Sequence, residues 1–304
     1  MALPSLEIDN HMSNHDEESK FLHPYFPHVL ATTDELYHSL GSKVVVIEVD
    51  QDPEAFEFGH IPTARLWNWS QDLRNEGTGE VISKQEFEAL MERTGLTSES
   101  DIVLYGDNNG WFACWAYWVL KSNGHQRVRI LDGSTNKWIR EGKPLETETP
   151  NLKPSSYEAI PNAPRSQATG ADIINAIFDQ KNHKLIDARS KPEYTGEMLS
   201  PGIGKDETCT VGGHIPTAIN IPWQENCRED GTFKSPDELR SLYESHGVTQ
   251  DQTVITYCSI GERASLSWFV LKELLGFKIA LNYDRSMAAW SRMPNAPIVR
   301  GEAA

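Results

Sequence analysis

The fold of this sequence is decided by one stretch, Tyr257-Cys258-Ser259-Ile260-Gly261-Glu262-Arg263-Ala264. The β-branched residues 253–256 come directly before it and predict a strand. Residues 266–271 follow it with apolar side chains at helical spacing, which predicts a helix. The cysteine therefore lies at a strand–helix junction, where the free N–H groups of the first helical turn favour a thiolate and hold an anion. Arg263, five residues after the cysteine, adds a fixed positive charge.

Composition and charge limit the classes of partner. The chain has 304 residues, enough for one large domain or two ordinary ones. Its 28 Lys and Arg against 44 Asp and Glu give a net charge of −16, which argues against nucleic acid and anionic membranes as main partners. No apolar run approaches the roughly 20 residues that a membrane helix needs. An anionic substrate must then be attracted by a local positive site.

The cysteines and the N-terminus indicate the compartment. The four cysteines, Cys114, Cys209, Cys227 and Cys258, show neither a CxxC pattern nor metal-ligand spacing, so we expect no bound metal. Four thiols in a chain of this length are no disulfide framework, which favours a reducing cytoplasm. Residues 1–16 lack the basic start and apolar core of a secretory signal, and residues 1–25 are predicted to be a disordered extension.

The chain repeats itself. Residues 105–138 align with residues 257–290 without a gap, at an offset of 257 − 105 = 152. The Gly-His-Ile-Pro-Thr-Ala run at 59–64 recurs at 213–218, an offset of 154. Residues 46–48 match 185–187 at an offset of only 139, which places a 15-residue insertion within 193–211 of the second half. Two copies of one structural unit explain this pattern.

Each copy alternates predicted strands and helices, which indicates an α/β fold with a mostly parallel sheet flanked by helices on both faces. We predict the first domain at 26–148, a linker at 149–166 and the second domain at 167–304. Ligands of such sheets bind at the carboxyl ends of the strands. That is where Cys258 is predicted to lie.

Several motifs, in the same order, resemble tandem-domain thiosulfate sulfurtransferases of the bacterial type, in the rhodanese family. The resemblance extends from about residue 27 to residue 298. The motifs in the second domain are Leu185-Ile186-Asp187-Ala188-Arg189, Gly213-His214-Ile215-Pro216, Asn220-Ile221-Pro222-Trp223, Asp230-Gly231-Thr232-Phe233 and the stretch from Tyr257 to Arg263. The resemblance implies two rhodanese-like domains, of which only the C-terminal one carries the cysteine. Here Gly106 aligns with Cys258, so the first domain is expected to lack the nucleophile.

The resemblance also implies a reaction without a cofactor. Cys258 would take the outer sulfur of a small anionic donor, become a persulfide and pass that sulfur to cyanide or a thiol. The backbone of Ser259, Ile260, Gly261, Glu262 and Arg263 would form the anion cradle around the sulfur. Arg189 and Arg263 are expected to bind the donor, and Asp187 to support the fold beside the loop.

Two departures from the family pattern leave the donor open. Thiosulfate enzymes commonly carry a basic residue directly after the cysteine. This chain has Ser259 there, and a small residue at this position favours 3-mercaptopyruvate as the donor. The pair Glu262-Arg263 instead resembles bacterial thiosulfate enzymes. Arg285 replaces the glycine of the family's Asp-Gly-Ser motif and either adds charge near the cleft or lies in solvent. We expect thiosulfate as donor, with 3-mercaptopyruvate as the alternative.

The same residues are compatible with other functions. Cysteine phosphatases and arsenate reductases place an arginine six residues after the cysteine, whereas here 263 − 258 = 5. A non-catalytic sulfur carrier or interaction module is a third possibility.

His60 and His214 recur in twin turns, so a shared structural role is favoured over a Cys–His pair. Trp111 and Trp115 are expected in the core or along the cleft, and Cys227 is a weaker candidate for relaying a persulfide.

Overall fold

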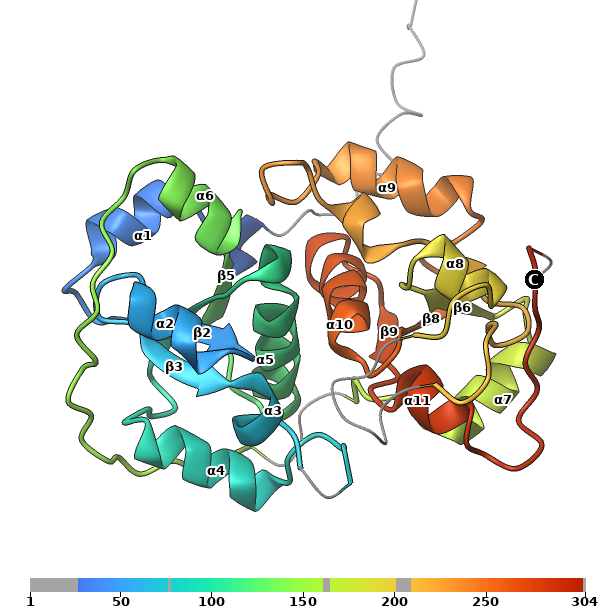
Figure 1. Ribbon diagram of the computed structural model, residues 1–304, viewed down its shortest axis with the longest axis horizontal. Coiled ribbons are helices and arrows are strands. Elements are labelled where there is room, and N and C mark those ends of the chain that lie inside the picture. Colours follow the sequence, from blue (N-terminus) through green and yellow to red (C-terminus); the bar gives the residue numbers. More distant parts are fainter. Residues whose placement is uncertain (1–26, 76–77, 161–164, 201–208, 303–304) are drawn as a thin grey trace, which may run out of the picture.

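The computed structural model describes residues 27–75, 78–160, 165–200 and 209–302. The predicted N-terminal extension, 1–25, lies outside the described residues, as do residues 201–208 of the segment 193–211 in which the insertion is predicted. The chain forms two lobes, each built around its own sheet (Figure 1). This confirms the prediction of two α/β domains.

The first sheet has the strand order β1-β5-β4-β2-β3, and all its strand pairs are parallel. Its strands are β1 (Leu30–Ala31), β2 (Val44–Asp50), β3 (Arg65–Asn68), β4 (Asp101–Tyr105) and β5 (Val128–Leu131). The helices of this domain are α1 (Thr33–Ser39), α2 (Pro53–Phe58), α3 (Trp69–Asp72), α4 (Lys84–Arg93), α5 (Trp111–Ser122) and α6 (Ser134–Arg140).

The second sheet is also parallel, with the order β7-β6-β8-β9. Its strands are β6 (His183–Asp187), β7 (Ile219–Asn220), β8 (Thr253–Tyr257) and β9 (Ile279–Asn282). The helices are α7 (Gly170–Phe178), α8 (Lys191–Thr195), α9 (Pro236–Ser245), α10 (Glu262–Phe269), a π-helical turn (Val270–Leu274) and α11 (Ser286–Trp290).

Both faces of each sheet are covered, as the sequence predicts. In β6 the neighbouring residues Leu185 and Ile186 belong to two different apolar clusters, because successive strand side chains point to opposite faces. Val103 and Leu104 of β4 divide in the same way. Strands buried on both faces are typical of parallel sheets between helix layers.

The two domains meet through α5 and α10, which pack against each other between the sheets (Figure 1). The ring centroids of Tyr117 and Phe269 lie 4.9 Å apart across this interface, and the Tyr117 hydroxyl donates a 2.9 Å hydrogen bond to Glu273. One apolar cluster extends through both domains. The first part of the predicted linker packs on the first domain, where the Ser155 N–H donates to the Glu92 carbonyl.

The repeat is visible in matched contacts. The Ser134 hydroxyl accepts a 3.0 Å hydrogen bond from the N–H of Gly106, and the Ser286 hydroxyl accepts one of the same length from the N–H of Cys258. Both serines have positive φ angles. Gly106 and Cys258 therefore occupy equivalent positions, as their alignment predicts.

Candidate active site

Cys258 directly follows β8, at the carboxyl end of a central strand of the second sheet. The N–H of Gly261 donates a 3.1 Å hydrogen bond to its Sγ, because the loop curls back around the sulfur. The two carbonyls at the start of the loop accept hydrogen bonds from α11, Cys258 from Met287 and Ser259 from Ala288. The loop is thus fastened on one side, and the sulfur is wholly buried.

Gly261 makes this curl possible. Its φ of +100° lies in the region that favours glycine, and it immediately precedes α10. A Cβ at this position would lie 2.5 Å from the Asp284 carbonyl oxygen and 2.5 Å from the Trp115 ring. Both the backbone conformation and the space therefore require glycine.

The surroundings of the sulfur favour the neutral thiol over the thiolate. Burial raises the pKa of Cys258 to about 12, with a further rise from the Glu262 carboxylate, against a lowering by Arg263 and the amides of Ala264 and Gly261. The Cys258 Sγ lies 3.4 Å from Glu262 Oε2, within donating distance. The loop amides do favour the thiolate, as the sequence predicts, but burial and Glu262 outweigh them.

Arg263 joins two carboxylates. Its Nη1 and Nη2 lie 2.9 and 3.1 Å from the Glu193 carboxylate, and its Nε lies 3.3 Å from Glu262 Oε1. Burial raises the pKa of Glu193, but hydrogen bonds and charge from Arg263 and a hydrogen bond from Ser190 bring it to about 2. Because Glu193 holds Arg263 in place, Arg263 in turn fixes the Glu262 carboxylate, which faces the Cys258 sulfur. Its predicted role in binding the donor stays a prediction, since these contacts already engage the guanidinium.

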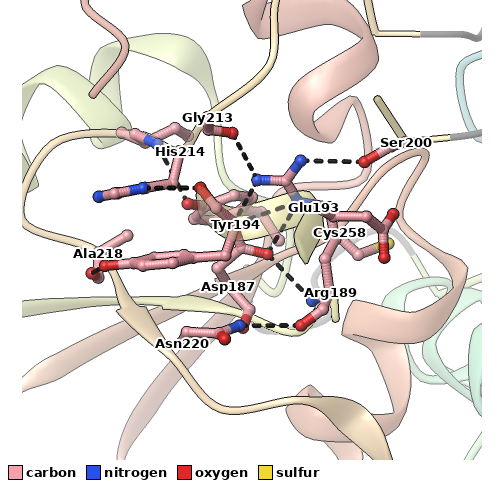
Figure 2. A network of polar contacts seen from close by, with 12 residues as sticks. Asp187, Arg189, Glu193, Tyr194, Ser200, Gly213, His214, Ala218, Asn220 and Cys258 are labelled. Atoms are coloured by element: carbon pink, nitrogen blue, oxygen red, sulfur yellow. Dashed lines mark hydrogen bonds and ion pairs between the residues drawn. The ribbon is translucent and has the colours of Figure 1, made fainter. Parts of the chain in front are cut away.

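Arg189 is buried and fully engaged as well (Figure 2). It donates to both carboxylate oxygens of Asp187, and its Nη1 and Nη2 donate to the Ser200 hydroxyl at 2.9 Å and the Gly213 carbonyl at 2.8 Å. Asn220 donates to the Asp187 and Arg189 carbonyls. The supporting role expected of Asp187 fits these contacts. Donor binding by Arg189 stays a prediction.

Ser259 and Ile260 face away from solvent, at 1% and 3% exposure. The Ser259 Oγ lies 3.9 Å from the Sγ of Cys209, a residue that no sequence motif had marked. Cys227, the candidate relay, belongs to the apolar cluster, and burial raises its pKa to about 12. No hydrogen bond among the described residues joins Cys227 to the loop.

The equivalent position in the first domain cannot hold a nucleophile. A Cβ on Gly106 would lie 2.2 Å from the Val49 carbonyl oxygen. Any cysteine there would force the backbone of β2 or the loop to shift. Of these two equivalent positions, only that of Cys258 can therefore carry sulfur.

The twin histidines have the same structural role. His60 stacks on Phe56 and His214 on Tyr194, each with ring centroids 3.7 Å apart. Each Nδ1 lies 2.9 Å from the backbone carbonyl oxygen of its stacking partner. The expected structural role for both histidines is supported by these matching contacts.

The first domain covers the loop through α5. Trp115 packs where a Gly261 side chain would extend, and the Trp111 carbonyl accepts a 3.3 Å hydrogen bond from Ser265 in α10. The ring of Trp111 also meets Trp223 at 5.0 Å. These two tryptophans therefore belong to the domain interface that buries Cys258. Their spacing at the start of a helix could not reveal which domain they would contact.

The site holds no evident metal centre: no cluster of three or more possible His, Cys, Asp or Glu ligands occurs in the described parts of the chain. Within the same parts, no helix is both long and apolar enough to cross a membrane.

The rhodanese-like domain pattern matches residues 32–141 and 170–293, one match in each lobe. The chain belongs to the rhodanese family. It is a tandem-domain member of this sulfurtransferase family, and the cysteine loop lies in its second match. Each match falls inside one predicted domain, although the boundaries at 148/149 and 166/167 stay predictions.

Curated relatives resemble this rhodanese-family chain along most of its length. It is 43% identical over 279 residues to "Sulfur carrier protein TtuD" of Thermus thermophilus, covering 91% of this chain and 98% of that protein. It is 41% identical over 256 residues to a Haloferax volcanii protein named "Putative thiosulfate sulfurtransferase", covering 84% of this chain and 88% of the relative.

Among solved structures, the anaerobic ergothioneine biosynthesis enzyme of Chlorobium limicola aligns with a TM-score of 0.79 at 22% identity, over 90% of this chain and 70% of that one. An EanB variant that carries a cysteine persulfide aligns with a TM-score of 0.80 at 21% identity, over 90% of this chain and 71% of that one. At these identities the likeness concerns the fold alone.

Proposed function

We propose that this protein is a thiosulfate sulfurtransferase that carries sulfur as a persulfide on Cys258. The observation that supports this most is the position of the sulfur between the Gly261 N–H, at 3.1 Å, and the Glu262 carboxylate, at 3.4 Å. The Gly261 N–H stabilises negative charge on the sulfur, and the Glu262 carboxylate can take the proton of the thiol. Together they offer what a buried nucleophilic cysteine needs.

In the first half-reaction the Cys258 proton passes to Glu262 as the sulfur attacks the outer sulfur of thiosulfate. The S–S bond of thiosulfate breaks, sulfite leaves with its bonding electron pair, and Cys258 keeps the transferred sulfur as a persulfide. The Gly261 N–H and the amides at the start of α10 stabilise the charge on the persulfide. Because Cys258 is buried, the donor reaches it only when side chains at the domain interface move aside.

In the second half-reaction an acceptor such as cyanide attacks the outer persulfide sulfur. The persulfide bond breaks, thiocyanate leaves and Cys258 regains its proton from Glu262. Arg263 acts as a positioning residue in both steps, because it holds Glu262 and is itself held by Glu193.

Two finer alternatives concern the donor and the acceptor. Ser259 in place of a basic residue favours 3-mercaptopyruvate as donor. The relative named as a sulfur carrier, at 43% identity, favours a protein thiol as acceptor instead of cyanide. Phosphate chemistry is not proposed, because the Arg263 guanidinium is already bound by Glu193 and Glu262 and is not turned toward a phosphate in the loop. All four cysteines are free thiols, which supports the cytoplasm as the proposed compartment.

Steady-state kinetics with both donors test the donor assignment. With cyanide as acceptor, we expect a higher kcat/KM for thiosulfate than for 3-mercaptopyruvate, and no turnover of either by Cys258→Ser. A higher kcat/KM for 3-mercaptopyruvate would replace the proposed donor with the alternative. Turnover retained by Cys258→Ser would reject the proposed mechanism.

A further inference from the structure

A small cavity of about 90 Å³ lies beside the sulfur loop, between the two domains. Ile260 belongs both to the loop and to the wall of the cavity. Ala288, another wall residue, is hydrogen-bonded through its N–H to the Ser259 carbonyl. The cavity is therefore coupled directly to the backbone that surrounds Cys258, and it has room for about three water molecules or one small ion.

Three arginines line this cavity, one from the first domain and two from the second. The Arg74 guanidinium lies 4.6 Å above the centre of the Trp69 ring and donates to the Gly79 carbonyl at 2.9 Å, so its position is fixed. Arg292 is exposed, and its Nη1 donates to the Ala288 carbonyl at 2.5 Å. In a chain with a net charge of −16, three arginines around one small cavity are a local reversal of the prevailing charge.

Two acidic residues partly offset this charge. Arg285 forms an ion pair with Glu80 across the domain boundary, but both side chains are exposed, at 39% and 52%. Exposed ion pairs contribute little, so an incoming anion competes readily with Glu80. Asp284 lines the cavity at 1% exposure, its Oδ2 has no hydrogen-bond partner among the described residues, and burial raises its pKa. Even with both carboxylates ionised, the set carries one net positive charge.

The arginines that the sequence suggests for the donor are already engaged. Arg189 binds Asp187, Ser200 and Gly213, and Arg263 binds Glu193 and Glu262. An anionic donor must nevertheless reach a sulfur that has a carboxylate 3.4 Å away. The positive charge that offsets this repulsion has to come from another part of the site.

We propose that Arg285 and Arg292, with Arg74, bind the oxyanion end of the sulfur donor in this cavity and so orient its outer sulfur toward Cys258. This inference rests on the proposed sulfurtransferase function. Guanidinium groups suit a sulfonate or carboxylate because they donate paired N–H groups to its oxygens. In this proposal Arg285, which stands where the family has a glycine, has a role in binding the donor.

Kinetics of the full chain provide the first test. In the Arg285→Gln/Arg292→Gln double variant we expect the KM for thiosulfate to rise about tenfold while kcat stays within about twofold, since a charge-assisted contact is lost away from the reacting sulfur. The control is Arg140→Gln, an exposed arginine on α6 that does not line the cavity. A double variant with the same KM as Arg140→Gln would overturn the inference.

Binding without turnover separates this inference from the proposed function. In the Cys258→Ser protein, sulfate is expected to raise the melting temperature, and the added Arg285→Gln/Arg292→Gln changes should remove that shift. If the shift depends on the arginines but wild type transfers no sulfur, the proposed function fails and the anion site stands. If wild type transfers sulfur but neither KM nor the sulfate shift depends on the arginines, the function stands and this inference fails. Far-ultraviolet circular dichroism confirms that each variant is folded.

Discussion

Gly261→Ala is expected to lower the rate of sulfur transfer more than about a hundredfold, because the Gly261 N–H is a backbone donor to the Cys258 sulfur. The new Cβ would lie 2.5 Å from both the Asp284 carbonyl oxygen and the Trp115 ring. The loop has to move to relieve these contacts, and the N–H moves with it. We also expect the free energy of unfolding to fall by roughly 3 kcal/mol, from the strained φ and the overlap. Urea unfolding and thiocyanate production measure the two effects.

Gly247→Ala is the matched control. Gly247 also has a positive φ, +70°, but a Cβ there meets nothing within 4 Å. This variant should lose only about 1 kcal/mol from backbone strain and keep wild-type sulfur transfer. If Gly261→Ala behaved like Gly247→Ala in both assays, the close packing of the loop against the first domain would not matter for the reaction.

Glu262→Gln is expected to slow persulfide formation at neutral pH by about a hundredfold, because it removes the group that takes the Cys258 proton. The same change should lower the pKa of the Cys258 thiol from about 12, because the carboxylate contributes to raising it. The variant would therefore hold more thiolate and yet react more slowly. Rapid-mixing kinetics with thiosulfate measure the rate, and ultraviolet absorbance of the thiolate measures the pKa.

The pH dependence separates the two roles of Glu262. Without a proton acceptor, the rate should follow the thiolate fraction and rise about tenfold per pH unit below the thiol pKa. The wild-type rate should depend on pH less steeply, because its proton moves within an existing hydrogen bond. If Glu262→Gln instead reacted faster than wild type at neutral pH, Glu262 would act only as a repelling charge.

Much of this architecture could be predicted because the sequence contains two copies of the same structural unit. Matching runs at a constant offset predict that Gly106 and Cys258 are equivalent. In the structure the N–H of each donates to the hydroxyl of a serine, Ser134 and Ser286 respectively. Alternating strand and helix patterns gave two parallel sheets, since such patterns have few other ways to bury both faces. The recurrence of the two histidines in twin turns predicts a shared structural role, and their matching ring contacts fit that role.

The protonation of the site could not be predicted in the same way. The helix N-terminus favours a thiolate, but burial of the sulfur under the first domain has a larger and opposite effect on the pKa of Cys258. Burial depends on how α5 packs against α10, which the local pattern does not contain. The Glu262 contact was open to prediction, because residues four apart at the start of a helix lie close together. The contacts of Arg189 and Arg263 depend on Glu193, Ser200 and Gly213, which are distant in sequence.

The cavity beside Ile260 could not be predicted from the sequence either, because it too depends on how the two domains pack. Arg74 and Arg292 are separated by most of the chain and belong to different domains, and they meet only because the domains close on each other. Arg285 alone gave a signal, as a departure from an expected glycine. That signal could not say whether the side chain faces solvent or the site.

The most direct test of the account is the mass of the intact protein after incubation with thiosulfate and removal of excess donor. We predict a gain of one sulfur atom, located by peptide mapping on Cys258, lost on treatment with cyanide and absent in Cys258→Ser. No gain in mass with any sulfur donor, or a gain located on Cys114, Cys209 or Cys227, would contradict the central claim that Cys258 carries the sulfur.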